Sequence, residues 1–139
     1  LSRRAVEVPS GLYPGEPVML EPLRQHAFIL DFAGDTAQAD LIYEQAVAVA
    51  GDAVPPQHPG RIIVERGAAR GLSRRGLHQE AETRMRELLA RTPPGAPEGS
   101  LVQRTRDATL RELAAVYRRW GRVEDAARIE AQRLDAAPG

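Results

Sequence analysis

Three glycines divide the chain into comparable helical blocks. Gly34, Gly76 and Gly121 each interrupt a stretch with helical periodicity, and they lie 42 and 45 residues apart. Two Pro-rich stretches, AVPPQHPG at 53–60 and TPPGAPEGS at 92–100, separate the blocks. Proline lacks the backbone N–H that a helix interior needs, so both stretches are predicted loops. Recurrence at a period of this size indicates a repeat architecture.

The residues around the three glycines indicate that the blocks are copies of one unit. An alanine stands seven residues before each glycine and another five residues after it. These alanines are Ala27, Ala69, Ala114, Ala39, Ala81 and Ala126. A large apolar residue stands four before each glycine: Leu30, Leu72 and Tyr117. Small residues suit close helix crossings and large apolar ones suit covering positions, so each block is predicted to be a helical hairpin.

The composition fits one domain built from helices. The 139 residues suffice for about one core, and 4% aromatic residues argue against a β-sandwich. The absence of cysteine excludes disulfides, thiol catalysis and zinc–thiolate sites. Net charge is zero, but residues 1–60 carry 3 Arg against 8 acids and residues 61–139 carry 16 Arg against 11 acids. All nineteen basic residues are arginine, a bias that we interpret as that of a GC-rich bacterial genome, so only arginine placement is informative.

The repeats resemble the tetratricopeptide repeat (TPR) family, in its kinesin-light-chain-like form with a spacing of about 42 residues. The resemblance rests on GLHQEAETRMRELLARTP and LAAVYRRWGRVEDAARIEAQRLDAAP in the second and third copies and on LRQHAFILDFAGDTAQADLIYEQAVAVAG in the first. The family has a tryptophan early in the repeat, and no copy here has one at that position. Leu23, Glu65 and Leu110 take its place. The first copy also has His26 where the family usually has leucine.

The resemblance implies an all-α fold, a right-handed α-solenoid of three TPR-like hairpins. The expected antiparallel helices span residues 20–33, 36–50, 59–74, 77–91, 100–119 and 122–136. The expected domains are an extended Pro/Gly-rich segment, 1–19, and a three-repeat domain, 20–139. Within that domain the repeats span about 20–52, 59–93 and 100–138. In such arrays the first helices line a concave groove, which is where partners bind.

The positions expected to face this groove carry many arginines. They lie ten, six, three and two residues before each turn glycine. The predicted peptide-binding residues are Arg24, Phe28, Phe32, Arg66, Arg70, Arg74, Arg111, Arg118 and Arg119. A guanidinium donates paired hydrogen bonds to carboxylate or phosphate, so the face suits an acidic peptide, a C-terminal carboxylate or a phosphorylated segment.

Two considerations qualify this interpretation. Arginines on one helix face also occur as plain solvated surface, paired with acids such as Glu65 or Glu112. The chaperone-binding members of the family clamp a carboxylate with lysine and asparagine, and this chain has neither, so we do not expect a chaperone partner. If the arginines are exposed, substituting Arg70 and Arg118 should alter binding and leave the fold intact.

Trp120 is the only tryptophan of the chain. It follows Leu113 and Tyr117 at helical spacing, which places it on the same helix face as two expected core residues. We expect it to be buried between the two helices of the third repeat. The alternative is an exposed anchor for a binding partner.

Nothing in the sequence predicts catalysis, a cofactor or a metal site. No glycine-rich loop follows a strand, no histidine pair has metal-ligand spacing, and no nucleophile has an evident base. His26 and His78 are expected to be packing or loop residues, and His58 lies in a predicted loop. We therefore predict a protein that is not an enzyme and holds no cofactor or metal.

Nucleic-acid binding, specifically RNA binding, is the alternative function. Helical solenoids can bind RNA, and a stripe of arginine is its electrostatic footprint. The neutral overall charge and the lack of aromatic residues among the arginines argue against it. We therefore favour a protein or peptide partner, and an interaction module or adaptor as the function.

The remaining expectations concern compartment and assembly. No apolar run approaches a membrane span, and residues 1–20 lack the apolar core of a signal peptide. We expect a soluble chain, cytoplasmic rather than periplasmic, that is monomeric or weakly self-associating. Because it begins at Leu1 rather than Met, we expect a processed form or a piece of a longer protein.

The two ends of the array are expected to differ. Glu130 and Arg133 replace the apolar residues of the earlier copies at the covering positions, so the last helix should be a polar cap with paired charges. Apolar Phe28, Ile29 and Phe32 lack such a cap at the other end. We expect the preceding segment to fold back over them, with self-association as the rival. Its covering residues would be Leu12, Tyr13, Val18 and Met19.

The alignment also makes a prediction about stability. Ala81 is expected to lie at a tight helix crossing in the second repeat, so Ala81→Leu should overpack the core and lower the free energy of unfolding by about 1–3 kcal/mol. Urea denaturation of the two forms measures this difference. A neutral substitution would mean that the second repeat has been placed in the wrong register.

Overall fold

The computed structural model describes residues 17–136, with the side chains of residues 52, 135 and 136 excepted. Within this range the chain is an all-α solenoid of three hairpins. Its helices are α1 (Leu20–Phe32), α2 (Thr36–Ala50), α3 (Pro59–Arg74), α4 (His78–Ala90), α5 (Leu101–Arg119) and α6 (Val123–Ala136), with a short 3₁₀ turn η2 (Gly51–Ala53) after α2. Each helix begins and ends within one residue of its predicted boundary. The right-handed sense and the domain boundaries stay predictions.

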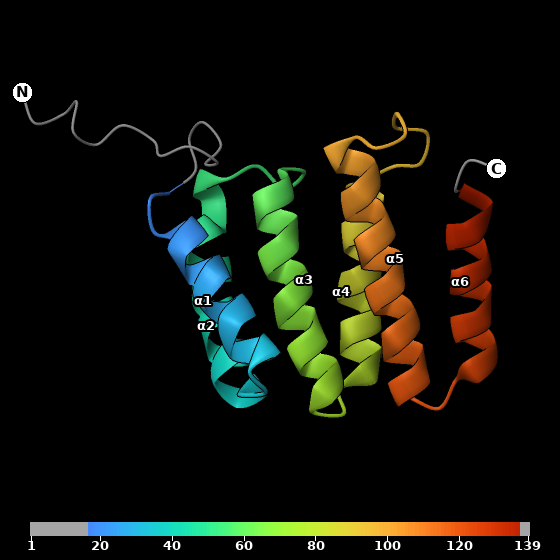
Figure 1. The fold of residues 1–139 in the computed structure, drawn as a ribbon, viewed down its shortest axis with the longest axis horizontal. Helices are drawn as coiled ribbons and strands as arrows, with labels where there is room; N and C mark the ends of the chain where they lie inside the picture. The colour runs from blue at the N-terminus through green and yellow to red at the C-terminus, as the bar shows by residue number, and fades with distance from the viewer. Residues whose placement is uncertain (1–16, 137–139) are drawn as a thin grey trace, which may run out of the picture.

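The helices stack as successive antiparallel pairs (Figure 1). The pairs α1–α2, α3–α4 and α5–α6 form the hairpins, and α2–α3 and α4–α5 make the contacts between neighbouring hairpins. The first helices α3 and α5 also pack directly on each other. In Figure 1, α1 is drawn in front of α2 and α5 in front of α4, so the first helices form one layer of the array.

The turn inside each hairpin is a glycine-dependent helix cap. Gly34, Gly76 and Gly121 have φ values of 91°, 87° and 81°. This left-handed conformation is accessible to glycine without the steric cost of a Cβ. The residue after each glycine donates its N–H to the carbonyl four residues before the glycine, at 2.9, 2.9 and 2.8 Å. The same Schellman arrangement therefore closes the first helix in all three repeats.

An arginine near the start of the second and third repeats holds the preceding loop. Arg61 Nη1 donates to the carbonyls of Gly51 and Val54, at 2.7 and 2.8 Å. Arg106 Nη1 donates to the carbonyls of Thr92 and Leu89, at 2.6 and 3.1 Å. Both arginines lie fifteen residues before their turn glycine. They satisfy carbonyls at the end of one repeat from the first helix of the next.

The core consists of two clusters, each spanning neighbouring repeats. One joins the first repeat to the second and includes Leu20, Tyr43 and Val64, all buried. The other joins the second repeat to the third and includes Met85 and Leu113, both fully buried. The six alanines that the alignment predicted to be at helix crossings are also buried. Each hairpin therefore shares its core with a neighbour.

Two neighbouring repeats approach each other closely where α2 crosses α3. A Cβ added to Gly67 would lie 2.5 Å from the ring of Tyr43, and one added to Gly71 would lie 2.7 Å from the carboxyl group of Asp40. These two glycines lie four residues apart on one face of α3. Their missing side chains let the ring and the carboxylate of α2 pack against the α3 backbone.

The C-terminal end carries the predicted charge pair. Arg133 Nη1 donates to Glu130 Oε1 at 3.0 Å, which confirms that pair, and Arg133 Nε also contacts Asp107 Oδ1 at 2.8 Å. At the N-terminal end, Leu12 and Tyr13 lie outside the described residues, so the predicted cover stays a prediction there.

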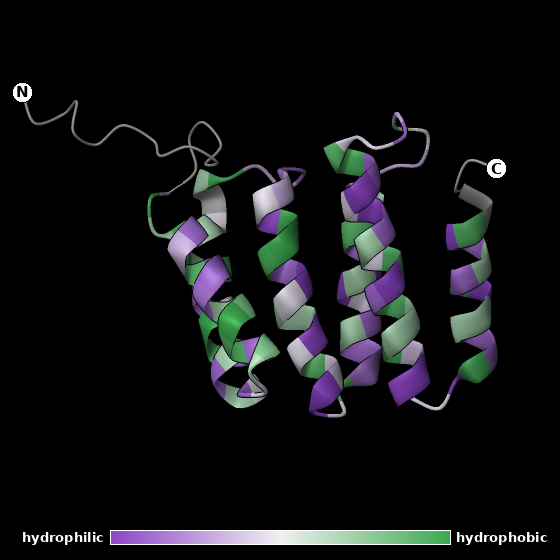
Figure 2. Ribbon diagram, in the orientation of Figure 1, coloured by the Kyte–Doolittle hydropathy of each residue, from purple (hydrophilic) through white to green (hydrophobic). Residues whose placement is uncertain are grey.

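The described part of that segment provides no cover. Val18 and Met19 are exposed, and the apolar residues of α1 that they were expected to shield are exposed too. Figure 2 shows this apolar character as green over the lower half of α1. In the same view, purple dominates the lower ends of α3 and α5.

The α2–α3 crossing makes a testable prediction. Gly67→Ala should destabilise the fold by about 1–2 kcal/mol, because overpacking against the buried Tyr43 ring outweighs the gain in helix propensity. Chemical denaturation measures the change. In a Tyr43→Leu background the same substitution should cost less, and an equal cost in both backgrounds would show that the ring is not the cause.

Candidate functional site

A pocket of about 470 Å³ lies between α1 and α3 and includes four of the predicted groove residues. It is lined by Glu21, Arg24, Gln25, Phe28 and Ile29 of α1, by Tyr43 of α2, and by Ile63, Arg66 and Arg70 of α3. We call it the α1/α3 pocket.

The wall of the α1/α3 pocket combines apolar and cationic side chains. Phe28, Ile29 and Ile63 supply the apolar surface, and Arg66 and Arg70 supply guanidinium groups. The cationic Arg24 at the α1 side is paired with Glu21, three residues before it. A group that combined an anion with an apolar side chain would match this wall.

Arg70 joins the three first helices of the array. It contacts Asp31 of α1 at 3.0 Å and Glu112 of α5 at 3.2 Å, and donates to the hydroxyl of Tyr43 at 3.2 Å. Burial acts to lower the pKa of Arg70, but Glu112, Tyr43 and Asp31 outweigh it, and the pKa is raised. A largely buried guanidinium with two carboxylates from other repeats is a structural ion-pair centre.

Arg74 extends this network towards α2. It contacts Asp31 at 2.7 Å, and both Arg74 and Arg75 lie 3.6 Å from the carboxylate of Asp40. Burial raises the pKa of Asp40, although Arg74 and Arg75 act in the opposite sense. Asp40 is the carboxylate that packs on the backbone at Gly71, so the ion pairs and the close helix approach occur at one place.

Arg66 differs from its neighbours because no carboxylate pairs with it within the described residues. Its Nη1 makes only long contacts, of 3.5 Å, to the carbonyl of Thr105 and the hydroxyl of Thr109 on α5. Burial lowers the pKa of Arg66, and the charge of Glu112 only partly offsets this effect. The guanidinium stays protonated at neutral pH, so the pocket wall holds a poorly compensated cation.

The premise that the groove arginines form an exposed surface is wrong for Arg70, whereas Arg111, Arg118 and Arg119 are exposed. Arg70 is largely buried and ion-paired, so it is a part of the framework. The carboxylates that pair with Arg70 come from other repeats. They are not neighbours three or four residues away on its own helix, as on a solvated helix face. Glu112 is one of them, whereas Glu65 pairs with Arg61 and Arg91, at 2.8 and 2.9 Å. Arg118 is exposed, as expected.

The remaining predicted groove residues lie outside the α1/α3 pocket. Phe32 is exposed and stacks on Phe28, with 6.4 Å between ring centroids. Arg111 is exposed and pairs with Asp107 on its own helix at 3.3 Å. Arg119 Nη1 donates to the hydroxyl of Ser73 at 3.2 Å, and burial lowers the pKa of this arginine.

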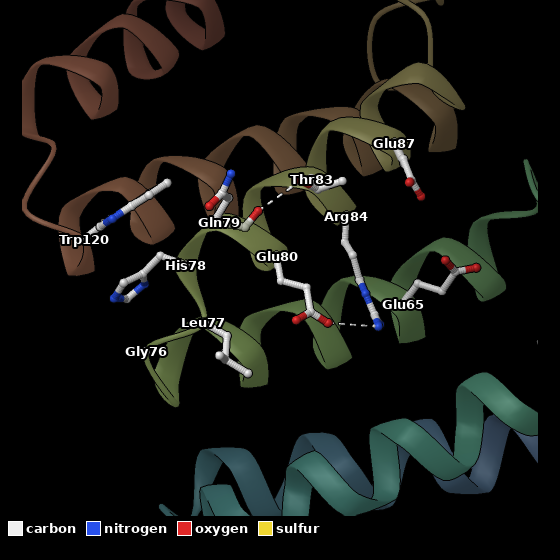
Figure 3. A pocket seen from close by; sticks show the side chains of 10 residues that line it. All are labelled: Glu65, Gly76, Leu77, His78, Gln79, Glu80, Thr83, Arg84, Glu87 and Trp120. Atoms are coloured by element: carbon white, nitrogen blue, oxygen red, sulfur yellow. Dashed lines mark hydrogen bonds and ion pairs between the residues drawn. The ribbon is translucent and has the colours of Figure 1, made fainter.

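Trp120 lies at a second and larger pocket, of about 830 Å³, over α4 (Figure 3). The indole is half-buried and stacks on His78, with 5.8 Å between centroids, and on Tyr117, at 6.2 Å. The guanidinium of Arg122 lies 4.5 Å from its ring centre. Trp120 is thus packed between the second and third repeats and is not enclosed within the third hairpin, and its role as a binding anchor stays a prediction.

This larger pocket is the weaker candidate for a binding site despite its volume. Figure 3 shows Trp120 and His78 at one end and Glu65 and Glu87 at the other. Glu65 already has two arginine partners, and Glu80 lies 3.6 Å from Arg84. Its aromatic end is occupied by its own stacking partners. Size alone therefore does not identify the site.

Two searches bear on other classes of site. Among the residues that the structure describes, no group of three or more histidine or carboxylate side chains could hold a metal ion. No helix within residues 17–136 combines the length and apolar character that crossing a membrane requires.

Comparison with known proteins addresses the fold. No protein-family model and no curated protein matches the chain. Solved structures do match, and two of them are of the nearly identical TPR-like repeats of a protein assigned as a kinesin light chain from Podosopora anserina, one in a single-substitution variant. The TM-scores are 0.68 and 0.66, each with 23% identity, over 91% and 90% of this chain.

The chain has a TPR-like fold. This confirms the predicted resemblance at the level of architecture, and identity of this size shows the fold alone. The chain spans 58% of the length of the structures that it matches.

The arginine network predicts that an ion-paired, largely buried arginine and an exposed arginine differ in their effect on stability. Arg70→Ala should destabilise the fold by about 2 kcal/mol or more, because Asp31 and Glu112 would lose their shared partner. Arg118→Ala should change stability by less than about 0.5 kcal/mol, because Arg118 is exposed. Thermal and urea unfolding of both variants test this. Equal stabilities would mean that the network contributes nothing.

Proposed function

We propose that the chain is a protein-interaction module that docks an acidic peptide or protein segment on the layer of first helices, with the α1/α3 pocket as its centre. The observation that supports this most directly is Arg66, a poorly compensated guanidinium beside apolar Phe28 and Ile63. The module has no chemistry of its own and acts as an adaptor.

The physical reason is the cost of a half-buried, weakly solvated cation at Arg66. A ligand carboxylate placed at Arg66 would supply the charge-assisted hydrogen bonds that Thr105 and Thr109 make only at 3.5 Å. An apolar ligand side chain beside it would bury the surface of Phe28 and Ile29. Both contributions favour a segment with acidic and apolar residues close together.

The ion-pair network supports this proposal by holding the site in place. Asp31, Arg70 and Glu112 connect α1, α3 and α5, so both walls of the α1/α3 pocket are fixed before a ligand arrives. A site organised in advance loses less conformational entropy on binding. The arginines of this network thus have a positioning role, while Arg66 is the group offered to the ligand.

The network also weighs against nucleic acid as the partner. Asp31 and Glu112 place two carboxylates among the arginines of this face, and these would repel a phosphate backbone. An acidic segment can be short enough to contact Arg66 alone. Binding of RNA in place of an acidic peptide is therefore one of the results that the experiment below distinguishes.

A labelled peptide of alternating glutamate and leucine is a suitable probe, measured by fluorescence anisotropy. Arg66→Gln should weaken its binding by at least about tenfold, the loss expected for one charge-assisted hydrogen bond. The exposed Arg118→Gln serves as the matched control and should bind like the unsubstituted chain. A peptide of alternating lysine and leucine should not bind.

Two results would contradict the proposal. One is unchanged affinity in Arg66→Gln, provided that its melting temperature shows an intact fold. The other is tight, steeply salt-dependent binding of a random single-stranded oligonucleotide with no binding of the acidic peptide, which would support the nucleic-acid interpretation.

A further inference from the structure

Each first helix has a face that corresponds to the one by which α3 and α5 stack on the preceding hairpin. This face is buried in α3 and α5 and exposed in α1. Its positions lie sixteen, twelve and five residues before each turn glycine. In α3 these are Gly60, Val64 and Gly71, and in α5 they are Thr105, Thr109 and Val116, all buried. The equivalent residues of the first repeat are Val18, Pro22 and Ile29, all exposed. α1 therefore presents a stacking face without a neighbour among the described residues.

The structure shows what kind of element covers such a face. On α3 it is the second helix of the preceding hairpin, with Tyr43 and Asp40 packed over the backbone at Gly67 and Gly71. On α5 it is α4, with Met85 in the shared core and Glu82 accepting a hydrogen bond from the hydroxyl of Tyr117. A covering element for α1 would by continuity be a second helix of the same type.

The exposed face of α1 is strongly apolar. The exposed fractions of Phe28, Ile29 and Phe32 are 62%, 62% and 86%. A contiguous apolar surface of this kind is unusual on a monomer and indicates an interaction site. Phe32 takes the position that Arg74 and Arg119 occupy in the later repeats, two residues before the turn glycine.

The free face of α6 differs from that of α2 and α4 in a matching way. Six residues after their turn glycines, α2 and α4 carry the acids Asp40 and Glu82, whereas α6 carries Ala127. Asp40 packs beside Arg74, the residue that Phe32 replaces in α1. α6 therefore lacks the acid that α2 and α4 carry, and α1 lacks the arginine that lies beside this acid in the α2–α3 contact.

Other residues of α6 extend this apolar character. Val123 and Leu134 of α6 are exposed large hydrophobic residues, and Ala127 between them is exposed as well. The polar residue of the same face, Glu130, is paired with Arg133. A helix packed over this face would therefore bury no unpaired charge.

We propose that copies of the chain associate head to tail, with α6 of one copy stacked on α1 of the next. By continuity with the contacts inside the array, Ala127 would lie against Ile29 and Phe32. Glu130 would lie beside Gln25, whose side-chain amide has a second N–H besides the one that it gives to Glu21. The contact shares Gln25 and Ile29 with the lining of the α1/α3 pocket, but it is argued from the exposed faces of α1 and α6 and does not require that a peptide binds.

The geometry of such a contact determines how the assembly grows. It joins two different surfaces, so each added copy leaves one free α1 face and one free α6 face, and the series stays open. The average mass should therefore rise continuously with concentration from the 15.2 kDa of one chain. A two-fold contact between two α1 faces would stop at two copies.

Sedimentation velocity on the full chain, over a wide concentration range, tests the proposal. Ile29→Glu blocks the α1 face and Ala127→Glu blocks the α6 face, and each variant alone should be monomeric. Mixed in equal amounts, they should form a species of two chains and nothing larger, because one usable face remains on each. Leu41→Glu, on an exposed position of α2 within the stack, is the control and should associate like the unsubstituted chain.

Three outcomes would overturn the proposal. The unsubstituted chain could stay monomeric throughout, as expected if the polar pair caps α6 or if the preceding segment covers α1. Ala127→Glu alone could still form pairs, which would indicate contact between two α1 faces. The mixture could fail to associate although both variants keep the melting temperature of the unsubstituted chain. Leu134→Glu provides a second block on the α6 face if Ala127→Glu lowers that temperature.

Discussion

Each hairpin of this chain buries its apolar face only by stacking on a neighbour, and the rest of the structure follows from that constraint. One close contact of this kind is the crossing of α2 over α3, where Tyr43 and Asp40 pack against the backbone at Gly67 and Gly71. The stack aligns the first helices in one layer, which creates the α1/α3 pocket. Within the described residues it also leaves one face of α1 and one face of α6 without a neighbour.

The same stacking determines the electrostatics of the candidate site. Asp31, Arg70 and Glu112 come from three consecutive first helices and meet only because those helices lie side by side. Because Arg70 is paired with both carboxylates, it is not available to bind an anionic ligand. It connects the three helices instead. Arg66, beside them, is left with two long hydrogen bonds. The binding chemistry of the layer thus depends on which arginines the stack has already neutralised.

Local sequence determined the architecture, because the signals involved act within a few residues. Turn glycines need φ values open to glycine, alanines mark close crossings, and prolines stop helices, so the boundaries of all six helices were predicted to within one residue. The Glu130–Arg133 pair was predictable for the same reason, since its partners lie three apart on one helix. The arginine-bearing positions of the first helices could also be named from periodicity.

Only the tertiary structure decided what those positions do. Burial of Arg70, its pairing with Asp31 and Glu112, and the stacking of Trp120 on His78 depend on residues from other repeats, about 40 positions away. Their distances are fixed by the angle and spacing of the stacked hairpins, which no local pattern encodes. The periodicity of one helix shows which face a side chain is on, but the charge and exposure of that face depend on the helix packed against it.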